Sequence, residues 1–280
     1  MLMKNYFFLL LVLLAFGCTK QEQSQKFITY NLRYNNPGDG VDRWDARKAN
    51  VVGLITKYQP DVFGTQEGLN GQITYLDSAL TDYSYVGVGR DDGKQKGEYC
   101  AVFYKTAKYE VVKQATFWLS ETPEEVSVGW DAALERICTY LLLENKQSGE
   151  RFYVFNTHFD HIGELARLNS SKLIYSKITE HNPEKYPCVL MGDLNLTPET
   201  APIQYLSEVL DETKSLAGEN CSGPQGTFNA FKHSEPVTDR IDYIFISKGD
   251  GVVNQFKIID DQIEERYPSD HLPVFVEVVL

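Results

Sequence analysis

Acidic, amide and imidazole side chains begin or end many of the apolar runs in this chain of 280 residues. In chain order they are Asn31, Glu67, His158, Asp160, His161, Asp193, Asn195, Asp242, Asp270 and His271. One polar residue at the end of a run is usually a solvated turn residue, but so many of them indicate a shared site. Oxygen ligands without thiolates favour a hard cation, Mg²⁺ or Mn²⁺, over structural zinc. Such a set can supply the cation, the activated water and the help for a departing alkoxide that phosphodiester hydrolysis needs.

Short β-rich runs separated by turn residues must position these groups. We predict eleven strands, over 26–31, 61–66, 84–88, 99–104, 109–118, 137–144, 151–157, 188–191, 240–247, 252–259 and 274–279. Apolar residues at helical spacing predict helices over 43–58, with Asp42 as N-cap and Pro60 beyond the end, and within 69–80, 165–178 and 203–210. No linker or internal repeat divides the chain. We therefore expect one domain over 27–280, an α/β fold in which two mixed sheets pack face to face with helices outside.

Several segments resemble the endonuclease/exonuclease/phosphatase superfamily, the deoxyribonuclease-I-like phosphoesterases. They are the Gly-Asp-Leu-Asn run at 192–195 and the Ser-Asp-His run at 269–271. The segments 44–48 (Trp-Asp-x-Arg-Lys) and 130–138 (Trp-Asp through Arg-Ile-Cys) resemble the exported branch of that family in Bacteroidetes. The resemblance covers the chain from about Phe27 onward. It implies a four-layer sandwich of two mixed β-sheets with outer helices, whose sheets converge on one metal site.

The resemblance also implies which residues bind the metal and activate the water. Glu67 would be the principal carboxylate ligand of the Mg²⁺ or Mn²⁺ ion, with Asn31 and Asp270 completing its surroundings. Asp193 would hold and deprotonate the attacking water, while Asn195 would orient it or steady the phosphate.

The two imidazoles would act on the phosphate. His271 would contact a non-bridging oxygen or transfer a proton, and Asp242 would fix its tautomer. His158 resembles the second phosphate-facing imidazole of the family, and the choice of acid and base among these groups stays open.

Three further residues are candidates for substrate binding: Arg136, Asp160 and His161. Arg136 could clamp a phosphate bidentately, and a plain surface ion pair is the equal alternative. For Asp160 we favour a structural pair with Arg167 over a second metal site. His181 and His233 are predicted at the surface, and Trp118 is predicted to pack in the core.

The net charge restricts the substrate. With 27 basic and 39 acidic side chains the charge is −12, which disfavours binding of nucleic acid by general attraction. We therefore favour a small phosphodiester, or a phosphorylated glycan or lipid headgroup, hydrolysed by a monomer. A nuclease acting on DNA or RNA is the first alternative, supported by Lys94 and Lys96 in a Gly-flanked loop. A non-catalytic lipoprotein binding a glycan or partner is the second, and a metal-free glycoside hydrolase is disfavoured further.

The N-terminus predicts export. The apolar run 6–17 follows Lys4 and is too short to cross a bilayer, so 1–17 reads as a signal peptide. Residues 15–18 (Ala-Phe-Gly-Cys) resemble a lipobox, which predicts acylation of Cys18, a tether over 18–26 and a bacterial lipoprotein at the outer membrane, held by its lipid alone. An ordinary secretory signal is the alternative. The other cysteines show no C-x-x-C spacing, so we expect buried thiols, with a disulfide as alternative, at Cys100, Cys138, Cys188 and Cys221.

Overall fold

The computed structural model describes residues 24–280. The signal peptide predicted over 1–17 and the acylated Cys18 lie outside the described residues. The end of the predicted tether is already part of the domain, because the first strand begins at Gln25. Between residues 24 and 280, no helix combines the length and the apolar character that crossing a membrane would need.

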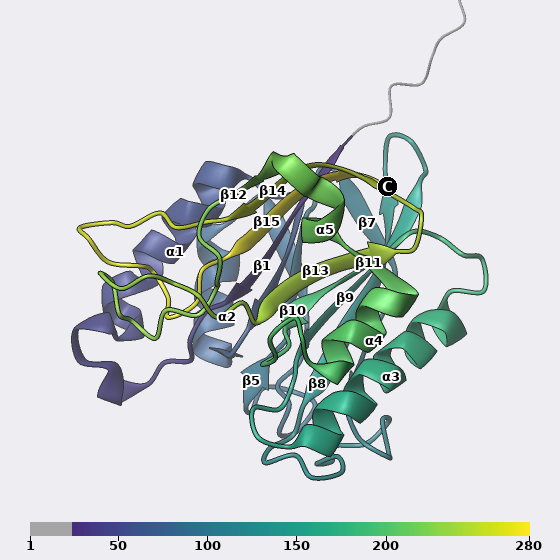
Figure 1. Cartoon of the computed structure of the whole chain (residues 1–280), viewed down its shortest axis with the longest axis horizontal. Coiled ribbons are helices and arrows are strands. Elements are labelled where there is room, and N and C mark those ends of the chain that lie inside the picture. The colour runs from purple at the N-terminus through teal and green to yellow at the C-terminus, as the bar shows by residue number, and fades with distance from the viewer. Residues whose placement is uncertain (1–23) are drawn as a thin grey trace, which may run out of the picture.

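Two large sheets form the centre of the fold (Figure 1). The first has the order β12-β14-β15-β1-β2-β6-β4, with bounds Cys221–Ser222, Val252–Ile258, Val274–Val279, Gln25–Asn31, Val62–Gln66, Val102–Lys105 and Tyr83–Val86. The second has the order β11-β13-β10-β9-β8-β7, with bounds Leu210–Glu212, Asp242–Ser247, Cys188–Asp193, Arg151–His158, Ile137–Asn145 and Tyr109–Trp118. Both are mixed, because β1 runs parallel to β2 and β9 parallel to β10. A small third sheet pairs β3 (Gly68–Leu69) with β5 (Glu98–Tyr99).

Helices cover the outer face of each large sheet (Figure 1). Helices α1 to α5 span Trp44–Tyr58, Asn70–Ala79, Glu164–His181, Ala201–Val209 and Thr213–Ala217, and the 3₁₀ helices η1 and η2 span Pro37–Asp42 and Gly218–Asn220. Val51 of α1 shares a buried cluster with Ile28 of the first sheet. Ile174 of α3 shares another with Leu190 of the second sheet. The predicted four-layer sandwich is confirmed.

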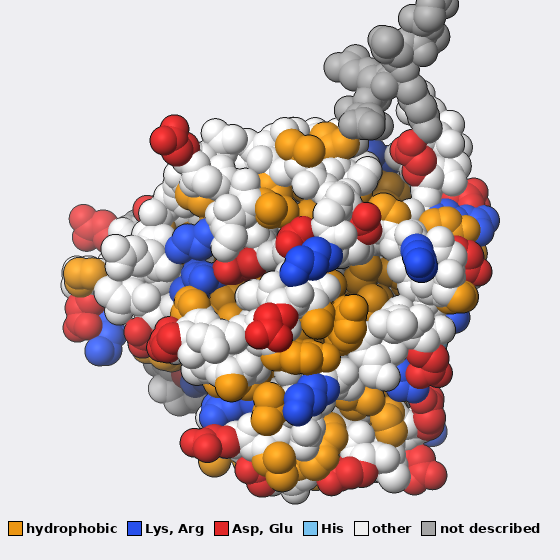
Figure 2. Space-filling model, turned by 45° about the vertical axis from the view of Figure 1, so that its right-hand side comes forward, with side chains coloured by type: hydrophobic (Ala, Val, Ile, Leu, Met, Phe, Trp, Pro, Cys, Tyr) orange, Lys and Arg blue, Asp and Glu red, His pale blue; other side chains and the backbone are white. Residues whose placement is uncertain are grey.

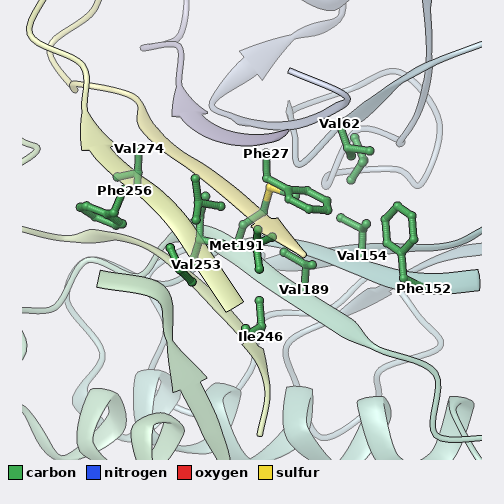
Figure 3. Packing of buried hydrophobic residues seen from close by; sticks show 14 of the residues in the cluster. Phe27, Val62, Phe152, Val154, Val189, Met191, Ile246, Val253, Phe256 and Val274 are labelled. Atoms are coloured by element: carbon green, nitrogen blue, oxygen red, sulfur yellow. The ribbon is translucent and has the colours of Figure 1, made fainter. Parts of the chain in front are cut away.

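The alternation of side chains along a strand produces these layers. In β10, Val189 and Met191 belong to the core between the sheets, whereas Leu190 belongs to the cluster below α3 and α4. Figure 3 shows Val189 and Met191 beside Phe27 of β1. A strand that is buried on both faces reads as a continuous apolar run, which is why the sequence predicts these strands closely.

Some predicted boundaries differ from the structure. The predicted strand 99–104 is divided into β5 and β6, because the Ala101 carbonyl accepts hydrogen bonds from Thr65 N and Asn156 Nδ2. Helix α1 has Arg43 at its N-cap rather than Asp42, whose carboxylate is instead bonded to Arg266. The sequence predicts none of the short elements β3, β11, β12 and α5.

The predictions for single residues are only partly confirmed. His181, predicted at the surface, is half-buried, and its ring stacks on that of Tyr140 with the centroids 4.6 Å apart. All four described cysteines are free, so the disulfide alternative is wrong. Cys100, Cys138 and Cys188 are buried as predicted, whereas Cys221 is half-buried. Trp118 is 7% exposed and donates from Nε1 to Arg90 O, as a packing residue. His233 is wrongly predicted at the surface, because its Nδ1 accepts a hydrogen bond from Tyr267 N and the side chain is 14% exposed.

Candidate active site

The candidate residues come from strand ends that the two sheets bring to one edge. Asp193, at the end of β10, lies opposite His158 of β9 and Asp242 of β13 in the second sheet. Asn31 ends β1 in the first sheet, level with the end of β2, and Glu67 follows directly. Asn31 Nδ2 donates to Asp193 Oδ2 at 2.9 Å and so links the two sheets at the site.

The backbone around these residues is unusual. Gly192 has a φ of 154°, and a Cβ there would lie only 2.1 Å from the Thr157 carbonyl oxygen, so β10 can approach β9 closely just before Asp193. Glu67 and Asn195 adopt left-handed φ values of 62° and 51°. Such conformations cost about 1–3 kcal/mol each in non-glycine residues and concentrate at functional sites.

Carboxylates and an imidazole converge at one point. Glu67, Asp193 and His271 each offer a ligand atom, and these atoms lie within 4.8 Å of one another. Asn31 Nδ2 donates to Glu67 Oε1 at 2.9 Å, and Asp270 lines the same cavity. Burial raises the pKa of Asp270, and the Glu67 carboxylate raises it further. Desolvated carboxylates placed together fit a hard divalent cation, so Asn31, Glu67 and Asp270 could hold Mg²⁺ or Mn²⁺.

Asp193 has the surroundings of a general base. It is 1% exposed, and its Oδ1 accepts a hydrogen bond from Asn195 N at 2.9 Å. Its Oδ2 lies 3.5 Å from His158 Nε2 and 3.7 Å from His271 Nε2. Burial raises the pKa of Asp193 to about 7, and the Asp242 carboxylate adds to the increase. A carboxylate with a pKa near neutrality is well matched to accepting a proton from water.

His271 is held as an imidazolium. Asp242 Oδ2 lies 2.9 Å from His271 Nδ1, which leaves Nε2 on the side of Asp193. Burial alone would lower the pKa of His271, but the carboxylates of Asp242 and Asp193 raise it well above its ordinary value. A positive charge is therefore available beside the candidate base near neutral pH.

His158, unlike His271, is neutral. Burial lowers its pKa well below the ordinary value, and the charges of Arg136 and Arg90 lower it further. Asn195 Nδ2 lies 3.0 Å from His158 Nε2 and 3.0 Å from Phe159 O. Because an amide nitrogen only donates, His158 Nε2 accepts, and the neutral ring carries its proton on Nδ1.

A cavity of about 350 Å³ lies against these groups. The predicted residues in its lining are Glu67, Arg136, His158, His161, Asp193, Asn195, Asp270 and His271. Asn31, Asp160 and Asp242 are at most 1% exposed and lie behind that lining. The lining also contains residues that the sequence does not predict: Arg33, Tyr34, Arg90, Glu98, Leu134, Phe228 and Ile241. Arg33 and Tyr34 follow Asn31 closely in the sequence, which could have indicated them. No motif marks Arg90 or Glu98.

The predicted pair of Asp160 with Arg167 is wrong. Asp160 Oδ1 accepts from Arg136 Nε at 3.2 Å, whereas Arg167 donates to the carbonyls of His161 and Ile162. The loop after β9 turns so that Asp160 faces inward, toward β8. Arg136 is 4% exposed, so the alternative of a surface ion pair is also wrong. Asp160, at 1% exposed, positions Arg136 instead of contacting substrate.

Arg47, from the Trp-Asp-x-Arg-Lys segment, joins the loops that carry the candidate ligands. It is 4% exposed and donates only to backbone carbonyls, those of Leu32, Arg33, Asp42 and Pro268. Leu32 and Arg33 follow Asn31, and Pro268 precedes Asp270 by two residues. One buried guanidinium therefore connects segments from distant parts of the chain beside the candidate ligands Asn31 and Asp270.

We expect the Arg47→Met variant to lose about 3 kcal/mol of unfolding free energy, because it leaves several buried carbonyls without a donor. Urea unfolding measures this loss. The matched control is Arg43→Met, at an exposed position in the preceding turn, which should change the free energy by less than about 0.5 kcal/mol. Equal stabilities of the two variants would contradict the role given to Arg47.

Known proteins are similar to this chain in sequence and fold. Residues 28–271 match the profile of the Endonuclease/Exonuclease/phosphatase family. A mannosyl-6-phosphatase of Bacteroides thetaiotaomicron is 38% identical, with a TM-score of 0.86 over 91% of this chain and 100% of that chain. A family protein of Bacteroides vulgatus is 36% identical, with a TM-score of 0.87 over 92% and 99% of the two chains.

Among curated proteins, the Ccr4 3'-5'-exoribonuclease subunit of Mycosarcoma maydis is 23% identical over 84% of this chain. This chain spans about half of that relative, 46% of its length. The family profile covers nearly all of the described domain, and the two Bacteroides structures agree with it in fold. The chain therefore belongs to the endonuclease/exonuclease/phosphatase family, whose members are phosphoric ester hydrolases.

Proposed function

We propose that this protein is a divalent-metal-dependent hydrolase of a phosphate ester on a sugar or lipid headgroup, acting outside the cytoplasm. The observation that carries the proposal is that Glu67, Asp193 and His271 meet at the cavity, with side-chain atoms within 4.8 Å of one another. A carboxylate for a cation, a carboxylate base and an imidazole are thereby placed around one point. The mannosyl-6-phosphatase that is 38% identical to this chain supports a phosphorylated sugar as the substrate class.

In the proposed reaction the cation would be held by Asn31, Glu67 and Asp270. It would supply positive charge against the phosphate oxygens. Asp193 would accept the proton of the attacking water, because its pKa of about 7 makes it a base near neutral pH. Asn195, bonded to Asp193 through its backbone N–H, would orient that water.

The two histidines would have different roles, and only His271 would act on the phosphate. His271, an imidazolium fixed by Asp242 at 2.9 Å, would neutralise a non-bridging oxygen or give a proton to the leaving alkoxide. His158 is neutral and accepts from Asn195, so it would hold that amide in place. Fixed donors of this kind are worth about 3–4 kcal/mol each in a transition state that gathers negative charge.

Surface charge supports a small substrate. Figure 2 shows basic and acidic side chains interspersed over one face rather than gathered into a basic surface. With a net charge of −12, a long polyanion would be repelled overall. The signal peptide and lipobox predicted from the sequence support export as a lipoprotein that contacts the outer membrane only through its lipid.

Two alternatives remain testable by the same measurement. The first alternative is a nuclease, as the name of the exoribonuclease relative suggests. That relative is only 23% identical to this chain, which is too distant to indicate a shared substrate. A non-catalytic binding protein would be expected to lack part of the site, yet the carboxylates, amides and imidazoles are all present around the cavity.

We expect the purified protein to hydrolyse 4-nitrophenyl phosphate or its bis-ester only with Mg²⁺ or Mn²⁺. EDTA should lower the rate by at least about 10³-fold, because the cation neutralises the transition state, and excess Mg²⁺ should restore it. A panel with mannose 6-phosphate, glycerophospholipids, DNA and RNA then ranks the substrates by kcat/KM. Turnover that resists EDTA would refute metal dependence, and faster turnover of nucleic acid would favour the nuclease.

A further inference from the structure

Arg33 lines the cavity and has a donor to offer to a ligand. Its side chain is 25% exposed. Nε and Nη2 donate to the two carboxylate oxygens of Asp39 at 3.1 and 3.0 Å, and the guanidinium carbon lies 4.6 Å from the centre of the Tyr34 ring. Nη1 takes no part in the pair with Asp39. The pair and the ring fix the plane of the guanidinium, so Nη1 is a preorganised donor.

The backbone of Arg33 is held in a conformation that is unfavourable for arginine. Its φ is 55°, in the left-handed region. Arg33 N donates to Asn31 Oδ1 at 2.9 Å, and its carbonyl accepts from Arg47 Nη2 at 2.7 Å and from Gln72 Nε2 at 3.0 Å. A strained backbone persists where its surroundings over-determine it, which is common at binding sites. The side chain is therefore presented in a fixed position relative to Asn31, a candidate ligand of the cation.

A short turn holds the carboxylate that fixes Arg33. Asp39 belongs to η1, none of whose residues is buried in the core, yet its side chain is only 8% exposed. Asn36 Nδ2 donates to Asp39 Oδ1 at 3.0 Å, and Asn36 Oδ1 accepts from Gly38 N at 2.9 Å. The carboxylate is therefore fixed by its own turn. Because Asp39 does not join the hydrophobic core, we assign its role to the contact with Arg33.

The surroundings of Arg33 suit a hydroxyl group better than a phosphate oxygen. Asp39 neutralises the guanidinium, Asp270 Oδ2 lies 3.8 Å from Nε, and Glu67 Oε2 accepts from the next residue, at Tyr34 N. These carboxylates repel an anion. A hydroxyl accepts from Nη1 and can donate its own proton to a neighbouring carboxylate oxygen. Where a cation neutralises Glu67 and Asp270, Asp39 still cancels the charge of Arg33.

The position of Arg33 is that of a residue that binds the alcohol half of the ester. In an in-line displacement the alcohol leaves on the side opposite the attacking water. Asp193, the candidate base for that water, lies between the imidazoles of His158 and His271. Arg33 instead contacts Asn31 and lies beside Asp270, where a divalent cation would stabilise a leaving alkoxide. The alcohol and its other hydroxyl groups therefore belong on the side of Arg33.

We propose that Arg33, held in place by Asp39, binds hydroxyl groups of the sugar that carries the phosphate, and that it is the residue by which the enzyme selects a sugar phosphate over an alkyl phosphate. This rests on the proposed function and names the residue that recognises the sugar. Asp39 is a positioning residue, because it acts through Arg33. An alcohol without further hydroxyl groups gives Nη1 no partner, so its ester is a poorer substrate.

The test compares two esters of primary alcohols, mannose 6-phosphate and n-hexyl phosphate, at saturating Mg²⁺. They share the phosphate and the type of leaving group and differ in their hydroxyl groups. Arg33→Met should lower kcat/KM about 30-fold for mannose 6-phosphate and less than about threefold for hexyl phosphate. Asp39→Asn should lower the first value about tenfold, mainly through KM, and leave the second nearly unchanged. The double variant Arg33→Met/Asp39→Asn, which has no unpaired carboxylate, should repeat the result of Arg33→Met.

Calorimetric titration separates recognition from turnover. In an Asp193→Asn background, where the ester is consumed slowly, Arg33→Met should weaken binding of mannose 6-phosphate about 30-fold and binding of inorganic phosphate less than about threefold. Arg33→Lys keeps the positive charge but not the planar fork that Asp39 holds, so it should behave like Arg33→Met. The matched control is Arg151→Met, which breaks a pair with Glu144 at the far end of the strand that carries His158 and should change none of these values.

Equal losses for the two esters, or equal weakening for the sugar phosphate and inorganic phosphate, would show that Arg33 binds the phosphate and would overturn the inference. Full rescue by Arg33→Lys would also overturn it, because a positive charge alone would then suffice. So would an unaltered protein that prefers hexyl phosphate or binds inorganic phosphate as tightly as the sugar phosphate. Failure to hydrolyse any phosphate ester with Mg²⁺ would instead contradict the proposed function, and the calorimetric comparison would still decide the role of Arg33.

Discussion

Replacing Asp193 by asparagine is expected to lower kcat by about 10³-fold, because the variant cannot accept the proton of the attacking water. Asparagine has nearly the same shape, and its single oxygen can still accept one of the two hydrogen bonds that Asp193 receives, the one from Asn195 N. The loss should therefore appear in kcat more than in KM. Steady-state rates with 4-nitrophenyl phosphate at saturating Mg²⁺ measure it, with Asp77→Asn, at an exposed position on α2, as the matched control.

The same variant should be more stable than the unaltered protein when no metal is present. Burial raises the pKa of Asp193 to about 7, above the value of about 4 in an unfolded chain. Ionisation is therefore harder in the folded state, and the stability of the unaltered metal-free protein falls as the pH rises from about 4 to about 7. At pH 8 the metal-free Asp193→Asn variant should melt at a higher temperature. An active variant, or one that melts lower at pH 8, would contradict the role of Asp193.

The sequence predicts the layers of the fold because each central strand is buried on both faces. The continuous apolar runs that contain Phe27 and Val189 predict strands whose two faces are both buried. The polar residue at the end of such a run marks the edge of the sheet where the site forms. Asp193 stands at such an end, and His271 stands just before the last strand. Strand register aligns Asp193 with His158 and Asp242, and the contact of Asp242 with His271 then brings His271 to the same place.

Partner choices between distant segments could not be predicted in the same way. Arg167 lies nearer to Asp160 in sequence than Arg136 does, but the loop after β9 turns the carboxylate toward β8. Asp42 precedes a helix as an N-cap would, yet Arg266 reaches it from the other end of the chain. Local spacing indicates which element a residue belongs to. The tertiary fold decides which charge it meets.

Replacing Asp242 by asparagine should lower kcat by about 10²–10⁴-fold, and the loss should increase with pH. Asp242 lies 2.9 Å from His271 Nδ1, and with Asp193 it raises the pKa of His271 well above the ordinary value despite burial, which acts in the opposite direction. Without that carboxylate the pKa of His271 falls, so the imidazolium is lost at a lower pH. At alkaline pH the variant then lacks the positive charge that neutralises a phosphate oxygen.

The measurement is kcat against pH from about 5.5 to 10 at saturating Mg²⁺. For the unaltered protein we expect a bell-shaped dependence of kcat on pH, in which deprotonation of Asp193 sets the acid limb and deprotonation of His271 sets the alkaline limb. Asp242→Asn should move the alkaline limb to lower pH, and His271→Gln should abolish that limb, because its amide does not titrate. The control Asp211→Asn changes a carboxylate of β11, on the strand that neighbours β13, and should keep both limbs.

An alkaline limb that stays in place in Asp242→Asn would show that His271 does not act as an imidazolium in the rate-limiting step. Asp242 would then only hold the ring in position, and its loss would lower kcat equally at every pH.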